Sequence, residues 1–171
     1  MTQHTEKPVV FIGGPFKAAV DPETGILSHE LQGRYRKLIG FYEENGWEVL
    51  SAHREEGWGL EMVPASVCTE RDFRWMGSCD LFVAFPGDPA SPGTHVEIGW
   101  GSAMGRPMIL LLEEQGRHAA LVTGLGGVAP ATTYLTYDEG PGFMASLAQA
   151  TADLGDRLGA GWPRAALADA R

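Results

Sequence analysis

The stretch Asp80-Leu-Phe-Val-Ala-Phe-Pro-Gly-Asp-Pro-Ala-Ser-Pro-Gly-Thr-His-Val-Glu-Ile-Gly-Trp-Gly101 decides the fold. Its apolar run Leu81–Phe85 is typical of a strand buried on both faces of a sheet. A loop rich in proline, glycine and serine follows, and a helix is expected over Thr94–Met104, with Glu97 in its first turn. Because helix N-termini attract anions, this junction predicts a phosphate site with a carboxylate beside it.

Strand and helix patterns alternate on both sides of this junction. The other strands are expected over Pro8–Ile12, Trp47–Leu50, Met108–Leu112 and Thr132–Tyr137. The other helices are expected over Ser28–Glu44, Ser66–Met76, 117–124 and Pro141–Leu158, and loops over 16–28 and 51–65.

This alternation predicts a single α/β domain that is doubly wound, as in flavodoxin-like and Rossmann-like folds. We expect a five-stranded parallel sheet with helices on both faces. The domain should span residues 1–171, with flexible ends at 1–7 and 160–171. Ligands of such sheets bind outside the carboxyl ends of the strands, so the loops 13–21, 51–62 and 86–96 are expected to hold the chemistry.

Composition excludes several classes of function. The net charge of −9 argues against a nucleic-acid or anionic membrane surface, because both need basic patches. No apolar run approaches the roughly 20 residues of a membrane helix, and no signal peptide is recognisable, so a cytoplasmic location is expected. Cys68 and Cys79 are isolated and without metal-binding spacing; we expect reduced, packed thiols, and neither a metal nor a cofactor.

Three residues at the start of the predicted helix have two interpretations each. Thr94-x-x-Glu97 is a capping-box pattern, in which Glu97 reaches back to the Thr94 N–H. The same placement would orient the Glu97 carboxylate and keep it ionised, as a carboxylate nucleophile requires. Ser91 and Gly93 are either turn-forming residues or part of an anion-binding nest.

Other candidates are weaker when each is taken alone. Asp72 lies on a helix that leads into the buried strand, whereas its neighbours Glu70, Arg71 and Arg74 fit a solvated face. A lone histidine such as His53 is more often structural than catalytic. A lone lysine such as Lys17 is usually solvent-facing, but its loop should lie next to the Ser91 loop in a sheet of this type. Phe16 and Trp58 fit either the core or a sandwich around a flat base, and Asp88 is expected to be exposed to solvent. No Ser-His-Asp order, P-loop or GxGxxG motif is present.

Five segments in order resemble the nucleoside 2-deoxyribosyltransferase family. They are Phe11-Ile-Gly-Gly-Pro-Phe16, Glu70-Arg-Asp72, Asp80-Leu-Phe-Val-Ala84, Ser91-Pro-Gly-Thr-His-Val-Glu-Ile-Gly99 and Gly105-Arg-Pro-Met-Ile109. The pattern Ser-x-Gly-x-x-x-Glu is similar to the branch that hydrolyses nucleoside 5′-monophosphates. Within it, the chain looks like the cytidylate and hydroxymethylcytidylate hydrolases of nucleoside-antibiotic biosynthesis.

The resemblance implies a reaction and a role for each candidate. The reaction is hydrolysis of the N-glycosidic bond of a pyrimidine nucleoside 5′-monophosphate, CMP or a 5-modified CMP, to free base and ribose or deoxyribose 5-phosphate. Glu97 would be the nucleophile or oxocarbenium stabiliser at C1′, and Asp72 would orient the sugar or help protonate the base. The substrate-binding residues would be Ser91, Gly93 and Lys17 at the phosphate, and Gly14, Phe16, His53 and Trp58 around the base or sugar.

The resemblance also implies a homodimer in which the neighbouring subunit completes the site. In the family a serine between the fourth and fifth strands often does so, but residues 116–123 contain none, and His118 or Thr123 would substitute. Two other functions stay open: base exchange between free nucleosides, and nucleotide binding without catalysis. A purely structural role has no positive feature in the sequence.

Overall fold

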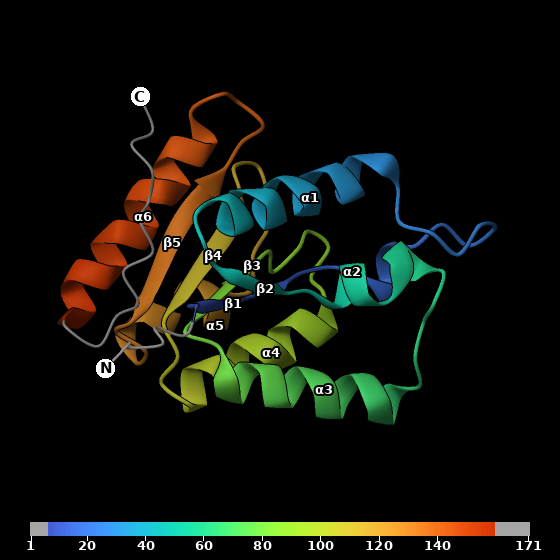
Figure 1. The fold of residues 1–171 in the computed structure, drawn as a ribbon, viewed down its shortest axis with the longest axis horizontal. Helices are drawn as coiled ribbons and strands as arrows, with labels where there is room; N and C mark the ends of the chain where they lie inside the picture. The colour runs from blue at the N-terminus through green and yellow to red at the C-terminus, as the bar shows by residue number, and fades with distance from the viewer. Residues whose placement is uncertain (1–6, 160–171) are drawn as a thin grey trace, which may run out of the picture.

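A computed structural model describes residues 7–159 of the chain (Figure 1). Five parallel strands form one sheet in the order β2-β1-β3-β4-β5. The strands are β1 Val9–Gly13, β2 Glu48–Leu50, β3 Leu81–Ala84, β4 Met108–Glu113 and β5 Thr132–Tyr137. This is the predicted single α/β domain with a five-stranded parallel sheet. Apart from Lys7, the ends expected to be flexible lie outside the described residues.

Helices cover both faces of the sheet (Figure 1). One face is covered by α1 (His29–Glu44) and α6 (Phe143–Leu158), and the other by α3 (Ala65–Ser78), α4 (Pro92–Ala103) and the short α5 (Ala120–Thr123). The central strands pack against both layers of helices and so contribute to an apolar core on each face of the sheet. In β3, Leu81 and Val83 face α1 and α6, while Phe82 faces α3 and α4. All four residues of β3 are buried, as the apolar run predicted.

The first helix follows its sequence signals closely. The Ser28 hydroxyl accepts a hydrogen bond from the Leu31 N–H at 3.2 Å and so caps α1. The helix then buries Tyr35, Leu38, Ile39 and Tyr42, which recur at helical spacing. It ends at Asn45, where Gly46 takes a φ of +84° that favours glycine.

Two local predictions are wrong. The predicted loop 51–65 contains a short helix, α2 (Ala52–Glu55), and a 3₁₀ turn, η2 (Gly57–Gly59), because elements this short show no periodicity in sequence. The helix expected to begin at Thr94 begins at Pro92, with Ser91 as its N-cap. Glu97 therefore lies in the second turn of α4, not the first.

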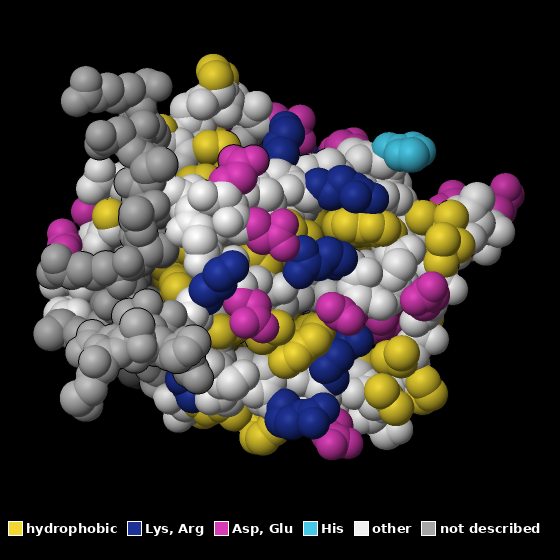
Figure 2. Space-filling model, in the orientation of Figure 1, with side chains coloured by type: hydrophobic (Ala, Val, Ile, Leu, Met, Phe, Trp, Pro, Cys, Tyr) yellow, Lys and Arg dark blue, Asp and Glu magenta, His cyan; other side chains and the backbone are white. Residues whose placement is uncertain are grey.

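Figure 2 shows how charged side chains are distributed on one face of the molecule. Basic and acidic side chains are interspersed there with apolar ones, and no broad basic patch is visible on this face. Within residues 7–159, no helix is long and apolar enough to cross a membrane.

Candidate active site

The candidate site lies where the strand order reverses, between β1 and β3. In a doubly wound sheet this switch point leaves a crevice at the carboxyl ends of the strands. The loops that follow the two strands are in contact there: a Cβ placed on Gly87 would lie 2.7 Å from Cγ of Pro15. Sequence analysis predicted that these loops would be neighbours, and they are.

Glu97 reaches this crevice from α4. Its Oε2 atom lies so near the last residue of β1 that a Cβ on Gly13 would be 2.7 Å away, and the Phe82 ring of β3 would be 2.9 Å from the same Cβ. The residue as a whole is partly exposed, but its carboxyl group is enclosed between the two strand ends. Glycine at position 13 is therefore what admits the Glu97 carboxylate.

Enclosure changes the protonation of Glu97. Burial raises the pKa of its carboxyl to about 8, the charge of Asp72 raises it further, and the charge of Arg71 opposes the rise. The capping-box interpretation is wrong, because Ser91 and not Thr94 caps the helix. The expectation that Glu97 is kept ionised is also wrong, since a carboxyl with this pKa is mostly protonated at neutral pH.

Asp72 lies on α3 and is buried, with only 9 % of the residue exposed. Burial raises the pKa of its carboxyl, while the hydrogen bond and charge of Arg71 oppose that rise. The Arg71 Nε–H donates to Asp72 Oδ1 at 2.9 Å, and its NH2 group pairs with Oε1 of Glu56 at 2.8 Å. The placement of Arg71 on a solvated face is therefore wrong: two carboxylates hold it inward.

The N-terminus of α4 forms the second part of the site. The Ser91 hydroxyl accepts hydrogen bonds from the Thr94 hydroxyl at 2.9 Å and, at 3.5 Å, from the Thr94 N–H. Its own proton stays available to a ligand. Gly93 is exposed in the first turn, where backbone N–H groups have no partner within the helix. This end of α4 can accept an anion.

Lys17 lies after β1 in η1 (Lys17–Ala19) and is exposed. Its Nζ donates to the Val63 carbonyl at 3.5 Å and lies 3.6 Å from the Cys68 thiol, so it points to the start of α3. Its charge acts on Asp72. A contact with a phosphate at Ser91 stays a prediction.

Gly14, Phe16 and His53 form a packed wall behind the crevice. The imidazole of His53 is stacked on Tyr35, with ring centroids 3.8 Å apart, and lies 4.7 Å from the Phe16 ring. Burial lowers the pKa of His53 to about 4, so it is neutral. The Tyr35 hydroxyl donates to the Pro15 carbonyl at 3.1 Å and fills the space that a side chain at Gly14 would need.

Trp58 lies in η2, and His118 lies in the segment between β4 and α5. Trp58 has a φ of +61° and packs under the Arg36 guanidinium, 4.3 Å from its ring centroid. His118 follows β4, with a side chain only 6 % exposed whose Nε2 is 3.6 Å from Oε2 of Glu113. Roles of either residue at a substrate stay predictions.

The loops after β3 and β4 are joined directly. The Arg117 N–H donates to Oδ2 of Asp88 at 3.0 Å. Asp88 is exposed, as predicted, but its carboxylate thereby fixes the segment that carries His118 beside the loop that leads to Ser91.

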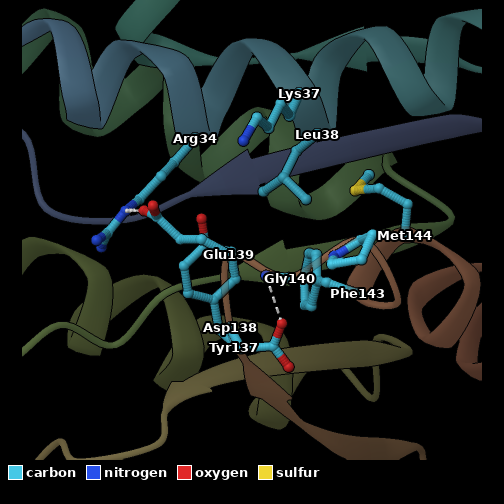
Figure 3. Close-up of a pocket in the computed structure, with 10 residues that line it drawn as sticks. Arg34, Lys37, Leu38, Tyr137, Asp138, Glu139, Gly140, Phe143 and Met144 are labelled. Atoms are coloured by element: carbon cyan, nitrogen blue, oxygen red, sulfur yellow. Dashed lines mark hydrogen bonds and ion pairs between the residues drawn. The ribbon is translucent and has the colours of Figure 1, made fainter.

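Among the described residues, a cavity of about 500 Å³ beside η2 is lined by Trp58, one of the candidates, together with Leu27 and Gln32. No group of three or more His, Cys, Asp or Glu among the described residues could hold a metal ion. A cavity of about 190 Å³ lies between α1 and the turn from β5 to α6 (Figure 3). Leu38, Tyr137 and Phe143 line it, and the Arg34–Glu139 ion pair of 3.1 Å lies at its edge. None of the candidate residues lines that cavity.

Sequence reasoning missed three residues of the site region: Arg71, Glu56 and Tyr35. Glu56 and Arg71 are 15 positions apart, so no local pattern joins them. Tyr35 follows the helical spacing of the buried residues of α1, which indicates a core position but not its contact with His53. The one available signal was the placement of Arg71 directly before Asp72.

Both the sequence and the structure of the chain are similar to those of known proteins. The sequence profile described as nucleoside 2-deoxyribosyltransferase matches residues 26–156. The structure is similar to that of the Clostridium botulinum CMP N-glycosidase BcmB, with 36% identity, 81% of this chain and 97% of that chain covered, and a TM-score of 0.60. It is also similar to the solution structure of BlsM, with 40% identity, coverage of 90% and 95%, and a TM-score of 0.75.

A more distant likeness concerns the fold alone. The 2-deoxyribosyltransferase of Bacillus psychrosaccharolyticus shares 17% identity, with coverage of 77% of this chain and 93% of that one and a TM-score of 0.54. A search of curated protein sequences gives no match.

Proposed function

The chain belongs to the nucleoside 2-deoxyribosyltransferase family, and from this membership we propose that it hydrolyses the N-glycosidic bond of a pyrimidine nucleoside 5′-monophosphate. The substrate is CMP or a CMP modified at C5, and the products are the free base and ribose or deoxyribose 5-phosphate. The pairing of Glu97 with Asp72 beside an anion-accepting helix end carries the proposal. The likeness to a CMP N-glycosidase supports the choice of substrate.

Binding of the 5′-phosphate is the first step of the mechanism. Ser91 and the Gly93 N–H hold the 5′-phosphate at the N-terminus of α4, and Lys17 adds its charge. Glu97 lies further along the same helix, so fixing the phosphate also fixes the distance from C1′ to the Glu97 carboxylate. Binding energy from the remote phosphate is thereby used to align the reacting carbon.

The two carboxyl groups then divide the roles of acid and base. Burial raises the pKa of Glu97 to about 8 and the charge of Asp72 raises it further, so Glu97 carries a proton at neutral pH. As the C1′–N bond breaks, its electron pair leaves with the base, which takes that proton by way of Asp72. The ionised Glu97 then meets the positive charge that develops at C1′.

Water completes the cycle. Its oxygen bonds to C1′ and displaces Glu97, or adds to the cation that Glu97 stabilises, and its surplus proton returns to the carboxyl pair. The sum is nucleotide plus water giving base plus sugar phosphate, with the enzyme restored.

A second copy of the chain is part of the proposal, with His118 of the neighbour completing the site once its side chain, which is buried against Glu113 of its own chain, turns outward. Exposed apolar side chains on the packed helices α3 and α4 support this partner: Phe73 is 48% exposed and Val96 is 50% exposed. Large apolar groups left in water on neighbouring helices are typical of interaction surfaces.

One assay separates the three candidate activities. CMP, dCMP, 5-hydroxymethyl-CMP, the other common nucleoside monophosphates and the matching nucleosides are incubated with and without an acceptor base. Hydrolysis releases base and sugar phosphate whether or not the acceptor is present. Base exchange forms a new nucleoside only with the acceptor, and a binding protein gives neither product. Release of base from no nucleotide would refute the proposal, and Glu97→Gln is the inactive control.

A further inference from the structure

An ion-pair chain supports the candidate site from outside the crevice. It begins at Glu56, which follows α2 and is 1 % exposed. Its Oε2 accepts a hydrogen bond from the Val63 N–H at 3.1 Å, and its Oε1 receives the Arg71 NH2 group at 2.8 Å. Glu56 is therefore fixed at both oxygens, and it in turn fixes Arg71.

Arg71, held by Glu56, in turn orients the Asp72 carboxylate. While one nitrogen of its guanidinium binds Glu56, the Nε–H donates to Asp72 Oδ1 at 2.9 Å. The guanidinium also lies over the Trp75 ring, 4.7 Å from its centroid. A planar fork held by two carboxylates and an aromatic ring has little freedom to turn, so the direction of the Asp72 carboxylate is set by Arg71.

We propose that Arg71 and Glu56 are positioning residues of the reaction: Glu56 orients Arg71, and Arg71 aims the Asp72 carboxylate at the position where it acts with Glu97. This inference rests on the proposed hydrolysis for its effect on rate. The chain Glu56–Arg71–Asp72 itself rests on the contacts alone.

Arg71 is the main positive charge that offsets the carboxyl groups around Asp72 and Glu97. Three carboxyl groups come from different elements, Glu56 after α2, Asp72 on α3 and Glu97 on α4. Lys17 of η1 adds a positive charge that acts on Asp72, and the charges of Glu97 and of Glu113 in β4 both act on Tyr35 of α1. Burial lowers the pKa of Arg71, but the hydrogen bonds and charges of Asp72 and Glu56 more than offset this, so it stays charged.

Removal of Arg71 therefore changes both catalytic carboxyl groups in one direction. Its charge lowers the pKa of Asp72 and of Glu97, so in Arg71→Gln both pKa values rise. The acidic limb of the kcat profile moves to higher pH. Loss of aim lowers kcat by about 10- to 100-fold, while KM stays within about 3-fold because the phosphate grip is untouched.

The experiment compares Arg71→Lys, Arg71→Gln, Glu56→Gln and the double variant Glu56→Gln/Arg71→Gln. The double variant removes Glu56 and Arg71 together, so neither of these two charges is left buried without the other, and the melting temperature reports whether the fold is kept. Arg74→Gln is the matched control, because Arg74 is an exposed arginine on the same helix. The measurements are kcat and KM against pH on CMP, the melting temperature, and the titration of Glu97 by carboxyl ¹³C NMR, assigned with Glu97→Gln.

The expected order of kcat is wild type and Arg74→Gln first, Arg71→Lys next, and the glutamine variants of Arg71 and Glu56 last. The Glu97 titration moves to higher pH in Arg71→Gln without any substrate. An unmoved titration, or kcat and pH profiles equal to those of Arg74→Gln, would overturn the inference. If the wild type hydrolyses no nucleotide, the proposed function fails, and the NMR titration still decides whether Arg71 controls the pair.

Discussion

Glu97 lies directly against Gly13: a Cβ on Gly13 would be only 2.7 Å from the Oε2 atom of Glu97. The carboxyl group of Glu97 on α4 thus packs against the backbone of the last residue of β1. The backbone of one strand therefore determines where the proposed nucleophile can be.

Gly13→Ala tests this relationship. The added methyl displaces the Glu97 carboxylate and the Phe82 ring, which should cost about 1–3 kcal/mol of unfolding free energy and lower kcat by about 10- to 100-fold. Gly33→Ala on α1 is the control, because a Cβ there meets open space and removal of a helical glycine stabilises by about 0.5–1 kcal/mol. Equal activity in the two variants would show that the contact does not position Glu97.

The raised pKa of Glu97 predicts a pH-dependent stability. Between the ordinary pKa of 4.5 and the folded value of about 8, the folded chain holds a proton that the unfolded chain has lost. The folded chain is therefore increasingly penalised as the pH rises through this window. Glu97→Gln cannot ionise and escapes the penalty.

The melting temperature of Glu97→Gln relative to wild type should consequently rise from pH 4.5 to pH 8. We expect a gain of at least about 2 °C at the upper end, which corresponds to roughly 1 kcal/mol in a chain of this size. Glu114→Gln, at an exposed position, is the control and should show no such trend. A constant difference across the window would contradict enclosure of the Glu97 carboxyl.

Ser91→Ala separates capping from substrate binding. Loss of the cap should cost about 0.5–2 kcal/mol of stability. Ser28→Ala removes the cap of α1 and should cost a similar amount, so it is the matched control. Only Ser91→Ala should raise the KM for a nucleotide, and it should leave weak binding of the nucleoside unchanged. If both variants behave alike in KM, Ser91 does not hold the phosphate.

Subunit mixing tests the shared site. Glu97→Gln and His118→Ala should each be nearly inactive alone. A site made from Glu97 of one chain and His118 of the other is intact once in each mixed dimer, so random pairing restores about one quarter of wild-type activity. Absence of any recovery in a mixture that forms dimers would show that His118 does not serve the neighbouring site.

The sequence predicted those parts of the molecule that local patterns encode. The apolar run of β3, the spacing of Tyr35 and Tyr42 on α1, and the Pro/Gly loop before α4 each determine structure within a few residues. These patterns also brought Glu97, Ser91 and Gly93 to one crevice, because neighbouring parallel strands end at the same edge of a sheet.

The parts that were missed depend on contacts between distant segments. Arg71 looks solvated in its own helix, and only the folded chain brings Glu56 to it. Likewise, no sequence pattern shows how closely β1 encloses the Glu97 carboxyl. The sequence therefore predicted an ionised carboxylate, whereas burial raises its pKa. His53 is buried and stacked on Tyr35, a contact that no local pattern shows, and its role at a substrate stays a prediction.

The hydrogen bond between Arg117 and Asp88 gains importance in a dimer. It joins the loop that leads to Ser91, at the proposed phosphate site, to the segment that would carry His118 into the neighbouring site. If nucleotide binding orders one loop, this hydrogen bond would restrain the other loop as well. Occupancy of one site would therefore change the nucleotide affinity of the other. Nucleotide uptake by the pair would then be cooperative, although each chain holds only one pocket.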